Sequence, residues 1–181
     1  MRLFHVSENP TIEIFYPRIP KRQDLDTTKG LVWAINERCL PNYLTPRNCP
    51  RVCFHAGAQT TEQDKRSYLS TASHVVVIER KWFEVLKNTK LYLYEFDSRE
   101  FILQDDNAGY YISERAQMPI AIFELDDVYQ ALLVRNVELR IVDSLWDIYD
   151  EIQQTTLNWS MCRMRFAQPR YRENCSDSNF S

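Results

Sequence analysis

Short apolar runs separated by turn residues are the feature that most restricts how this chain folds. Runs such as His74–Ile78 and Leu91–Phe96 are rich in β-branched and aromatic residues, which favour strands. Segments with helical spacing are fewer, and the first long one covers residues 79–87. Because strands and helices do not alternate regularly, the order predicts an α+β fold instead of a repeated βαβ arrangement.

The remaining elements follow from the same patterns. The predicted strands cover residues 3–7, 31–35, 51–55, 74–78, 91–96, 101–103, 110–113, 119–123 and 137–141. Asp126 or Asp127 is expected to cap a helix that runs to about Arg135, and Ser144 to cap a last helix with Leu145, Ile148, Tyr149 and Ile152 on one face. Residues 61–69 are a solvated helix or loop, and Trp159–Phe166 docks onto the core or onto a second subunit.

The length and charge of the chain limit its organisation and its partners. Its 181 residues suit one domain over residues 1–171, followed by a polar tail over residues 172–181. The N-terminus has no apolar signal run, and no stretch reaches the ~18 apolar residues of a membrane span, so we expect a cytoplasmic protein without a membrane partner. The net charge of −3 argues against a broad basic face for duplex nucleic acid.

The glycines exclude two common ways of holding a nucleotide. Gly30, Gly57 and Gly109 are too far apart to form either a Rossmann fingerprint or a P-loop. A bound nucleotide would therefore have to be held by side chains.

The five cysteines are expected to be free thiols, because an odd number in a reducing compartment argues against a disulfide framework. The densest group, Cys49, Cys53 and His55, offers zinc ligands, but no second pair with metal-ligand spacing follows it. Buried cysteines on a strand are the favoured interpretation, and no metal is predicted.

Two series of motifs resemble small ADP-ribosyltransferase-like proteins. The first is Leu3-Phe4-His5-Val6-Ser7, then Ile12–Pro17, then Leu31-Val32-Trp33-Ala34; the second is Leu91–Phe96, Phe101, Tyr110–Ser113 and Pro119. The similarity spans roughly residues 1–125, and the whole chain also resembles a bacterial family of similar length with no assigned activity. The resemblance implies a mixed core of two packed β-sheets with a few flanking helices, and NAD as the substrate.

The same resemblance implies a set of site residues. His5 would hydrogen-bond the ribose beside nicotinamide, and Tyr111 would stack on the nicotinamide ring. Further NAD contacts would come from Ser7, Arg18 and Trp33, while Tyr110 and Glu114 would join His5 as catalytic residues.

One position departs from the family pattern. Tyr110 stands where many relatives have the glutamate that stabilises the oxocarbenium-like centre, and the nearby acids that would substitute for it are Asp105, Asp106 and Glu114. Such acids beside a glycine are more often solvated loop residues. Loss of the glutamate favours binding of NAD without efficient transfer.

Three functions stay open on these residues. The leading one is an NAD-binding ADP-ribosyltransferase-like enzyme that transfers ADP-ribose to a macromolecule or to water. The second is a non-catalytic module of the same fold that binds a nucleotide or a protein. The third is an enzyme acting on RNA or DNA phosphate ends through His5 and a set of cations, namely Arg18, Lys21, Arg22, Arg47 and Arg51. The sequence does not indicate an oligomeric state.

Overall fold

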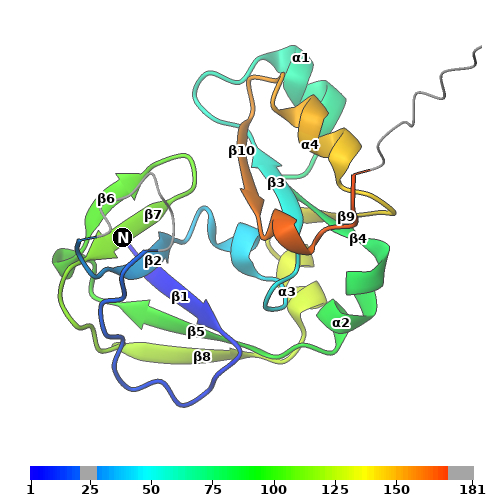
Figure 1. Cartoon of the computed structure of the whole chain (residues 1–181). Helices are drawn as coiled ribbons and strands as arrows, with labels where there is room; N and C mark the ends of the chain where they lie inside the picture. The colour runs from blue at the N-terminus through cyan, green and yellow to red at the C-terminus, as the bar shows by residue number, and fades with distance from the viewer. Residues whose placement is uncertain (21–27, 171–181) are drawn as a thin grey trace, which may run out of the picture.

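The computed structural model of the chain describes residues 1–20 and 28–170. Two β-sheets lie side by side, and most of the helices gather around the smaller sheet (Figure 1). The prediction of a mixed α+β fold with two sheets and few helices is confirmed. In the described part of the chain, no helix combines the length and apolar character needed to cross a membrane.

The large sheet has six strands, and every neighbouring pair is antiparallel. Its strand order is β6-β7-β2-β1-β5-β8. The strands are β1 (Leu3–Ser7), β2 (Val32–Asn36), β5 (Leu91–Phe96), β6 (Ile102–Asp105), β7 (Tyr110–Ser113) and β8 (Ala121–Leu125).

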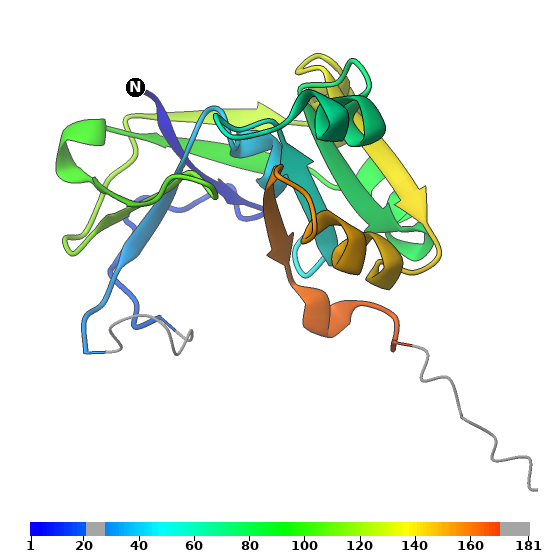
Figure 2. The ribbon, with the colours of Figure 1, turned by 90° about the horizontal axis from the view of Figure 1, so that it is seen from above.

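The small sheet has the order β10-β3-β4-β9, and its β4–β9 pair is parallel. Its strands are β3 (Arg51–His55), β4 (His74–Glu79), β9 (Val137–Val142) and β10 (Asn158–Cys162). The chain passes from the large sheet to the small one, returns, and passes again, so neither sheet is a continuous stretch of sequence. Figure 2 shows the two sheets from above, with the large sheet on the left.

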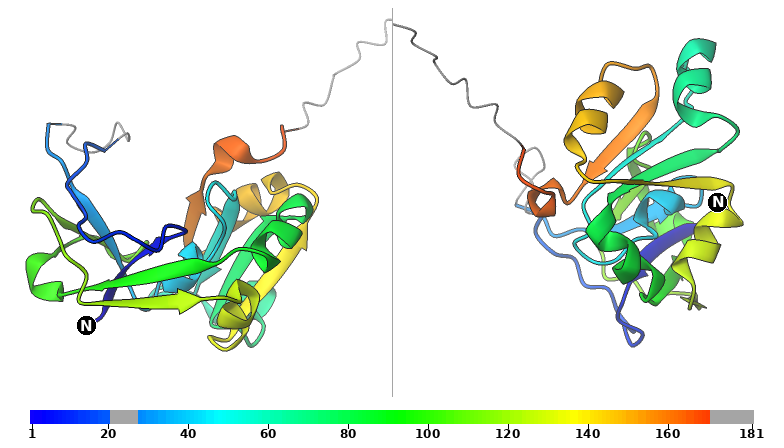
Figure 3. Two further views of the ribbon diagram at one scale, coloured as in Figure 1. Left: turned by 90° about the horizontal axis from the view of Figure 1, so that it is seen from below. Right: turned by 90° about the vertical axis from the view of Figure 1, so that its right-hand side faces the viewer.

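The helices are short. The α-helices are α1 (Glu62–Asp64), which continues as a π-helical turn (Lys65–Leu69), α2 (Phe83–Lys87), α3 (Val128–Leu133) and α4 (Trp146–Ile152). Single 3-10 turns cover Leu40–Tyr43, Arg80–Trp82, Ser98–Glu100 and Met164–Phe166. The last of these follows β10 directly, as Figure 3 shows.

Strand alternation divides the buried side chains into three clusters. Phe4, Ile35 and Leu93 of the large sheet pack against Cys53 and Val76 of the small sheet, which forms the core between the sheets. The outer face of the small sheet packs under α4, through Val52, Phe54, Val75, Val77, Leu145 and Ile152. The outer face of the large sheet is covered by Ile12 and Phe15, which pack on Leu3, Ala34, Tyr94, Phe96 and their neighbours.

Most predicted elements lie within two residues of the observed ones, and two differences have clear causes. The last helix begins at Trp146 with Leu145 at its N-cap position, so Ser144 is not the cap; its Oγ only accepts a 3.4 Å bond from the Trp146 N–H. The strand expected over 119–123 begins at Ala121, because Pro119 lacks an N–H. Asp127, by contrast, caps α3 as expected by accepting from the Gln130 N–H at 2.8 Å.

Candidate functional site in a cleft between the sheets

His5 lies on β1, at the centre of the outer face of the large sheet. Its Nδ1 is 3.0 Å from the carbonyl oxygen of Trp33, and its ring centroid is 4.8 Å from that of Phe15. Because a carbonyl only accepts hydrogen bonds, Nδ1 carries the proton of the neutral ring. Burial lowers the pKa of His5, and the nearby Arg18 charge lowers that pKa further. His5 is therefore a neutral, packed imidazole at pH 7.

Strand alternation separates the residues that the resemblance assigned to one NAD site. His5 pairs with Tyr94, and Tyr111 pairs with Ala34, so His5, Ser7 and Tyr111 share the outer face. The next residue along each strand points the other way. Tyr110 and Trp33 consequently lie on the inner face, with their ring centroids 5.2 Å apart.

Tyr110 instead faces a second feature, an open cleft of about 730 Å³ where the inner face of β7 approaches β10. The side chains that give the cleft its character are Tyr43, Arg51, Tyr110, Cys162 and Arg163. Trp159 also borders the cleft, but it pairs with Phe54, whose side chain lies on the outer face of the small sheet. This volume lies within the range of small-molecule sites. The cleft therefore brings together residues from both sheets, including β3, β7 and β10.

The β10 wall was not predicted as a strand. Strand β10 pairs with β3 in antiparallel register, with Asn158 opposite His55 and Cys162 opposite Arg51. Trp159 remains 39% exposed because β10 is the edge of the small sheet. At the end of the strand, Arg163 adopts a left-handed conformation with φ 58°, which is uncommon for a residue other than glycine.

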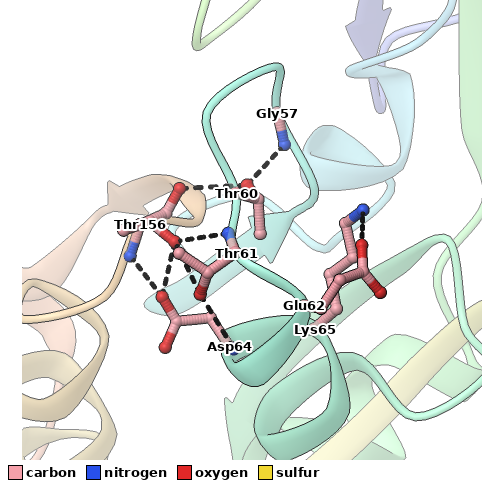
Figure 4. Close-up of polar contacts among 7 residues, drawn as sticks. All are labelled: Gly57, Thr60, Thr61, Glu62, Asp64, Lys65 and Thr156. Carbon is pink, nitrogen blue, oxygen red and sulfur yellow. Dashed lines mark hydrogen bonds and ion pairs between the residues drawn. The ribbon is translucent and has the colours of Figure 1, made fainter.

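A polar cluster fixes the start of β10 against the α1 segment (Figure 4). A carboxylate oxygen of Asp64 accepts bonds from both the N–H and the hydroxyl of Thr156. The Thr61 N–H donates to the Thr156 hydroxyl at 2.9 Å, and the Thr60 hydroxyl donates to the Thr156 carbonyl at 2.9 Å. A Cβ added at Gly57 would meet the side chain of Asn158 at 2.5 Å, so this loop and β10 are in close contact.

Arg51 is the most unusual group in the cleft. The residue is only 6% exposed, and its Nε and Nη1 atoms donate to the carbonyls of Asn42 and Cys49 at 2.6 and 3.0 Å. Within residues 1–20 and 28–170, no carboxylate forms an ion pair with it. A buried cation without an anionic partner is costly, so an arginine in a cleft wall is suited to bind an anion.

Aromatic rings surround that guanidinium. The Arg51 Cζ lies 5.5 Å from the centroid of the Tyr43 ring, and the Tyr43 and Tyr110 centroids are 5.6 Å apart. Burial raises the pKa of Tyr43 above its ordinary value, so its hydroxyl stays neutral. Rings of this kind stack on planar ligands, and Tyr110 has the position to do so.

Of the three acids considered as substitutes for the missing glutamate, only Asp105 lines the cleft. Its Oδ1 accepts from the Ala108 N–H at 3.1 Å, which shapes the turn before Gly109. Asp106 pairs with Arg38 at 3.2 Å, and Glu114 pairs with Lys29 at 2.8 Å. Glu114 thus lies outside the cleft that Tyr110 lines.

The arginines and the lysine that were considered for binding phosphate also lie in different places. Arg51 lines the cleft, Arg18 lies near His5 on the other side of the sheet, and Arg47 is not part of the cleft wall. Lys21 and Arg22 lie outside the described residues. The expected single group of arginines around His5 is therefore not seen among the described residues.

The cysteine prediction is confirmed for the described residues: Cys39, Cys49, Cys53 and Cys162 are free thiols, and Cys175 lies outside them. Burial raises the pKa of Cys49 to about 12 and that of Cys53 further above its ordinary value. Among the described residues, no three side chains of the metal-binding types come together. That the protein uses no metal stays a prediction.

Sequence reasoning identified Tyr110 and Arg51 but assigned them to two different hypotheses, and it missed Tyr43 and Cys162. The signal that was available is the run Asn158–Cys162, whose aromatic and polar residues suit an edge strand. Its position near the C-terminus gave no indication that it would lie beside β3.

Comparison with known proteins gives one result that covers most of the chain. No curated protein and no solved structure matches. The signature of DUF6886, described as a family of unknown function, matches residues 4–167, a span that contains all the residues that line the cleft and every strand of both sheets except Leu3, the first residue of β1. The chain is therefore a member of the DUF6886 family.

Proposed function

We propose that the cleft between β7 and β10 binds a nucleotide-class ligand, with its phosphate near Arg51 and Arg163 and its planar ring beside Tyr43 and Tyr110. The observation that carries the proposal is the buried guanidinium of Arg51, which lacks a carboxylate partner among the described residues and lines an open cleft. Arginine suits this role because its guanidinium keeps its charge and donates charge-assisted hydrogen bonds to phosphate oxygens.

The cleft supports binding more strongly than it supports transfer. Tyr110 and His5 lie on opposite faces of the large sheet, so they do not share one cavity. The ADP-ribosyltransferase-like activity that the resemblance implies stays a prediction, and so do its transfer to a macromolecule or to water and a cytoplasmic location. Of the functions considered from sequence, we favour the non-catalytic module, with NAD as the first ligand to test.

Calorimetry with NAD, ADP-ribose and AMP tests the proposal. We expect binding by the parent chain, at least about fivefold weaker binding after Tyr110→Ala, because stacking is worth about 1–3 kcal/mol per base, and weaker binding after Arg163→Gln. Arg18→Gln is the matched control, since it removes the same charge near His5, away from the cleft.

Three outcomes separate the alternatives. If His5→Ala and Arg18→Gln weaken binding while the cleft variants do not, the outer face is the binding site and the proposal is wrong. If none of the three compounds binds the parent chain, the proposal is also wrong. Release of free nicotinamide from NAD, measured chromatographically, would show that binding leads to cleavage.

A further inference from the structure

Cys162 differs from the other described cysteines in its surroundings. Cys39, Cys49 and Cys53 are buried, whereas Cys162 is partly exposed and lines the cleft. Its Sγ lies 3.5 Å from the Ser160 hydroxyl. Among the described residues, Cys162 is therefore the only thiol that combines exposure with a position in the cleft wall.

The residue beside this thiol is Arg51, the buried cation of the cleft. Cys162 is directly opposite Arg51 in the β10–β3 register, and residues that pair in this way present their side chains on the same face of the sheet. Cys53, two residues along β3, belongs to the core between the sheets, so this shared face is the one that meets the large sheet. The guanidinium of Arg51 and the Cys162 thiol therefore face the same cleft.

The positive charge of Arg51 indicates that a reagent suited to this site carries a negative charge. Arg51 is 6% exposed and has no carboxylate partner among the described residues, and Arg163 is exposed at the end of β10. A small molecule with a carboxylate would supply the missing anion while its electrophilic carbon lies near Cys162.

We propose that Cys162 is a covalent modification site for small electrophiles that carry a carboxylate, which Arg51 and Arg163 hold beside the thiol. The site uses the cleft of the proposed function, but it does not require that a nucleotide bind there. With iodoacetate as the probe, the thiolate sulfur forms a bond to the methylene carbon and the carbon–iodine bond breaks. Iodide leaves with the bonding electron pair, and the thiol proton goes to solvent.

The test compares iodoacetate with neutral iodoacetamide. Peptide mapping by mass spectrometry gives the alkylation rate at Cys162, in the folded chain and in denaturant. We expect the iodoacetate-to-iodoacetamide rate ratio at Cys162 to be about fivefold higher in the folded chain than in denaturant, because one guanidinium at contact distance favours the anionic reagent by that order. Arg163→Gln should lower the ratio, whereas Arg18→Gln should leave it unchanged.

The outcomes of the alkylation test can be distinguished from those of the nucleotide-binding test. If the ratio is the same in the folded chain and in denaturant, or if Cys39, Cys49 or Cys53 reacts faster than Cys162, the modification site is wrong even where nucleotides bind. If the ratio rises as expected while calorimetry detects no nucleotide, the modification site holds and the proposed function fails. Protection of Cys162 by bound AMP would show that both ligands occupy the same cleft.

Discussion

The two faces of the large sheet have the same kind of sequence but different surroundings. On the outer face, Phe15 closes over His5, Tyr94 and Phe96, with ring centroids 4.8–5.1 Å apart. On the inner face, the small sheet covers Phe4 and Ile35 but leaves Tyr110 beside an open cleft. The comparison teaches that an aromatic residue on a strand becomes accessible to a ligand only where the neighbouring layer ends.

Removing the cover of the outer face is the change with the largest expected effect. Phe15→Ala should lower the free energy of unfolding by about 2–3 kcal/mol, because the ring packs on His5, Tyr94 and Phe96. Nucleotide binding should be unchanged, since Phe15 is not part of the cleft. Urea denaturation and calorimetry measure the two quantities, and Ile14→Ala, at a 37% exposed neighbour, is the control. Tighter binding in Phe15→Ala would indicate that the outer face holds a ligand site.

Acid should destabilise the sealed interior more than it affects the open cleft. His55 and His74 stack with ring centroids 4.6 Å apart, and burial lowers both pKa values to about 4. Since the unfolded pKa is near 6.5, the stability these rings contribute is complete above about pH 6.5 and is lost as the pH falls toward 4. We expect this pair to be a main source of the acid sensitivity.

The measurement is the pH dependence of the unfolding free energy between pH 7 and pH 4. His55→Phe should flatten it, because a phenyl ring stacks but does not take up a proton. An equally steep profile in His55→Phe would mean that other groups cause the acid sensitivity.

The polar cluster at the start of β10 should have a moderate effect on both stability and binding. Asp64→Ala removes the acceptor for the Thr156 N–H and hydroxyl, which should cost about 1 kcal/mol of stability. Ligand affinity should fall as well, because Thr156 precedes the strand that carries Trp159 and Cys162. Thermal denaturation and calorimetry test this, with Glu62→Ala, an exposed neighbour that forms an ion pair with Lys65, as the control. Unchanged affinity would show that the cluster stabilises the fold without positioning the cleft.

Glu114→Gln should have the smallest effect. The residue forms an ion pair with Lys29 in which both side chains are 55% exposed, and such pairs contribute about 0–1 kcal/mol. Its distance from the cleft wall predicts unchanged nucleotide affinity and unchanged nicotinamide release. A loss of either in the Glu114→Gln variant would restore the catalytic role that the resemblance implies.

Local sequence was sufficient for most elements of this fold. The runs around Leu3–Ser7, His74–Glu79 and Leu91–Phe96 form strands because β-branched and aromatic side chains suit a pleated, buried surface. Because Tyr110 and Tyr111 are adjacent on a strand, alternation alone places them on opposite faces, so at most one of them lines a given cavity. These properties depend on neighbours within a few residues along the chain.

Only the tertiary structure decided which of those faces has space beside it. The parallel pairing of β4 with β9, the addition of β10 to the edge of β3, and the contact of Phe15 with His5 all join residues that are far apart in sequence. Their free energy comes from apolar area buried between whole layers, which no local pattern specifies. The sequence thus determined the strands and the orientation of their side chains, whereas packing between the layers sealed His5 and left Tyr110, Arg51 and Cys162 in a cleft.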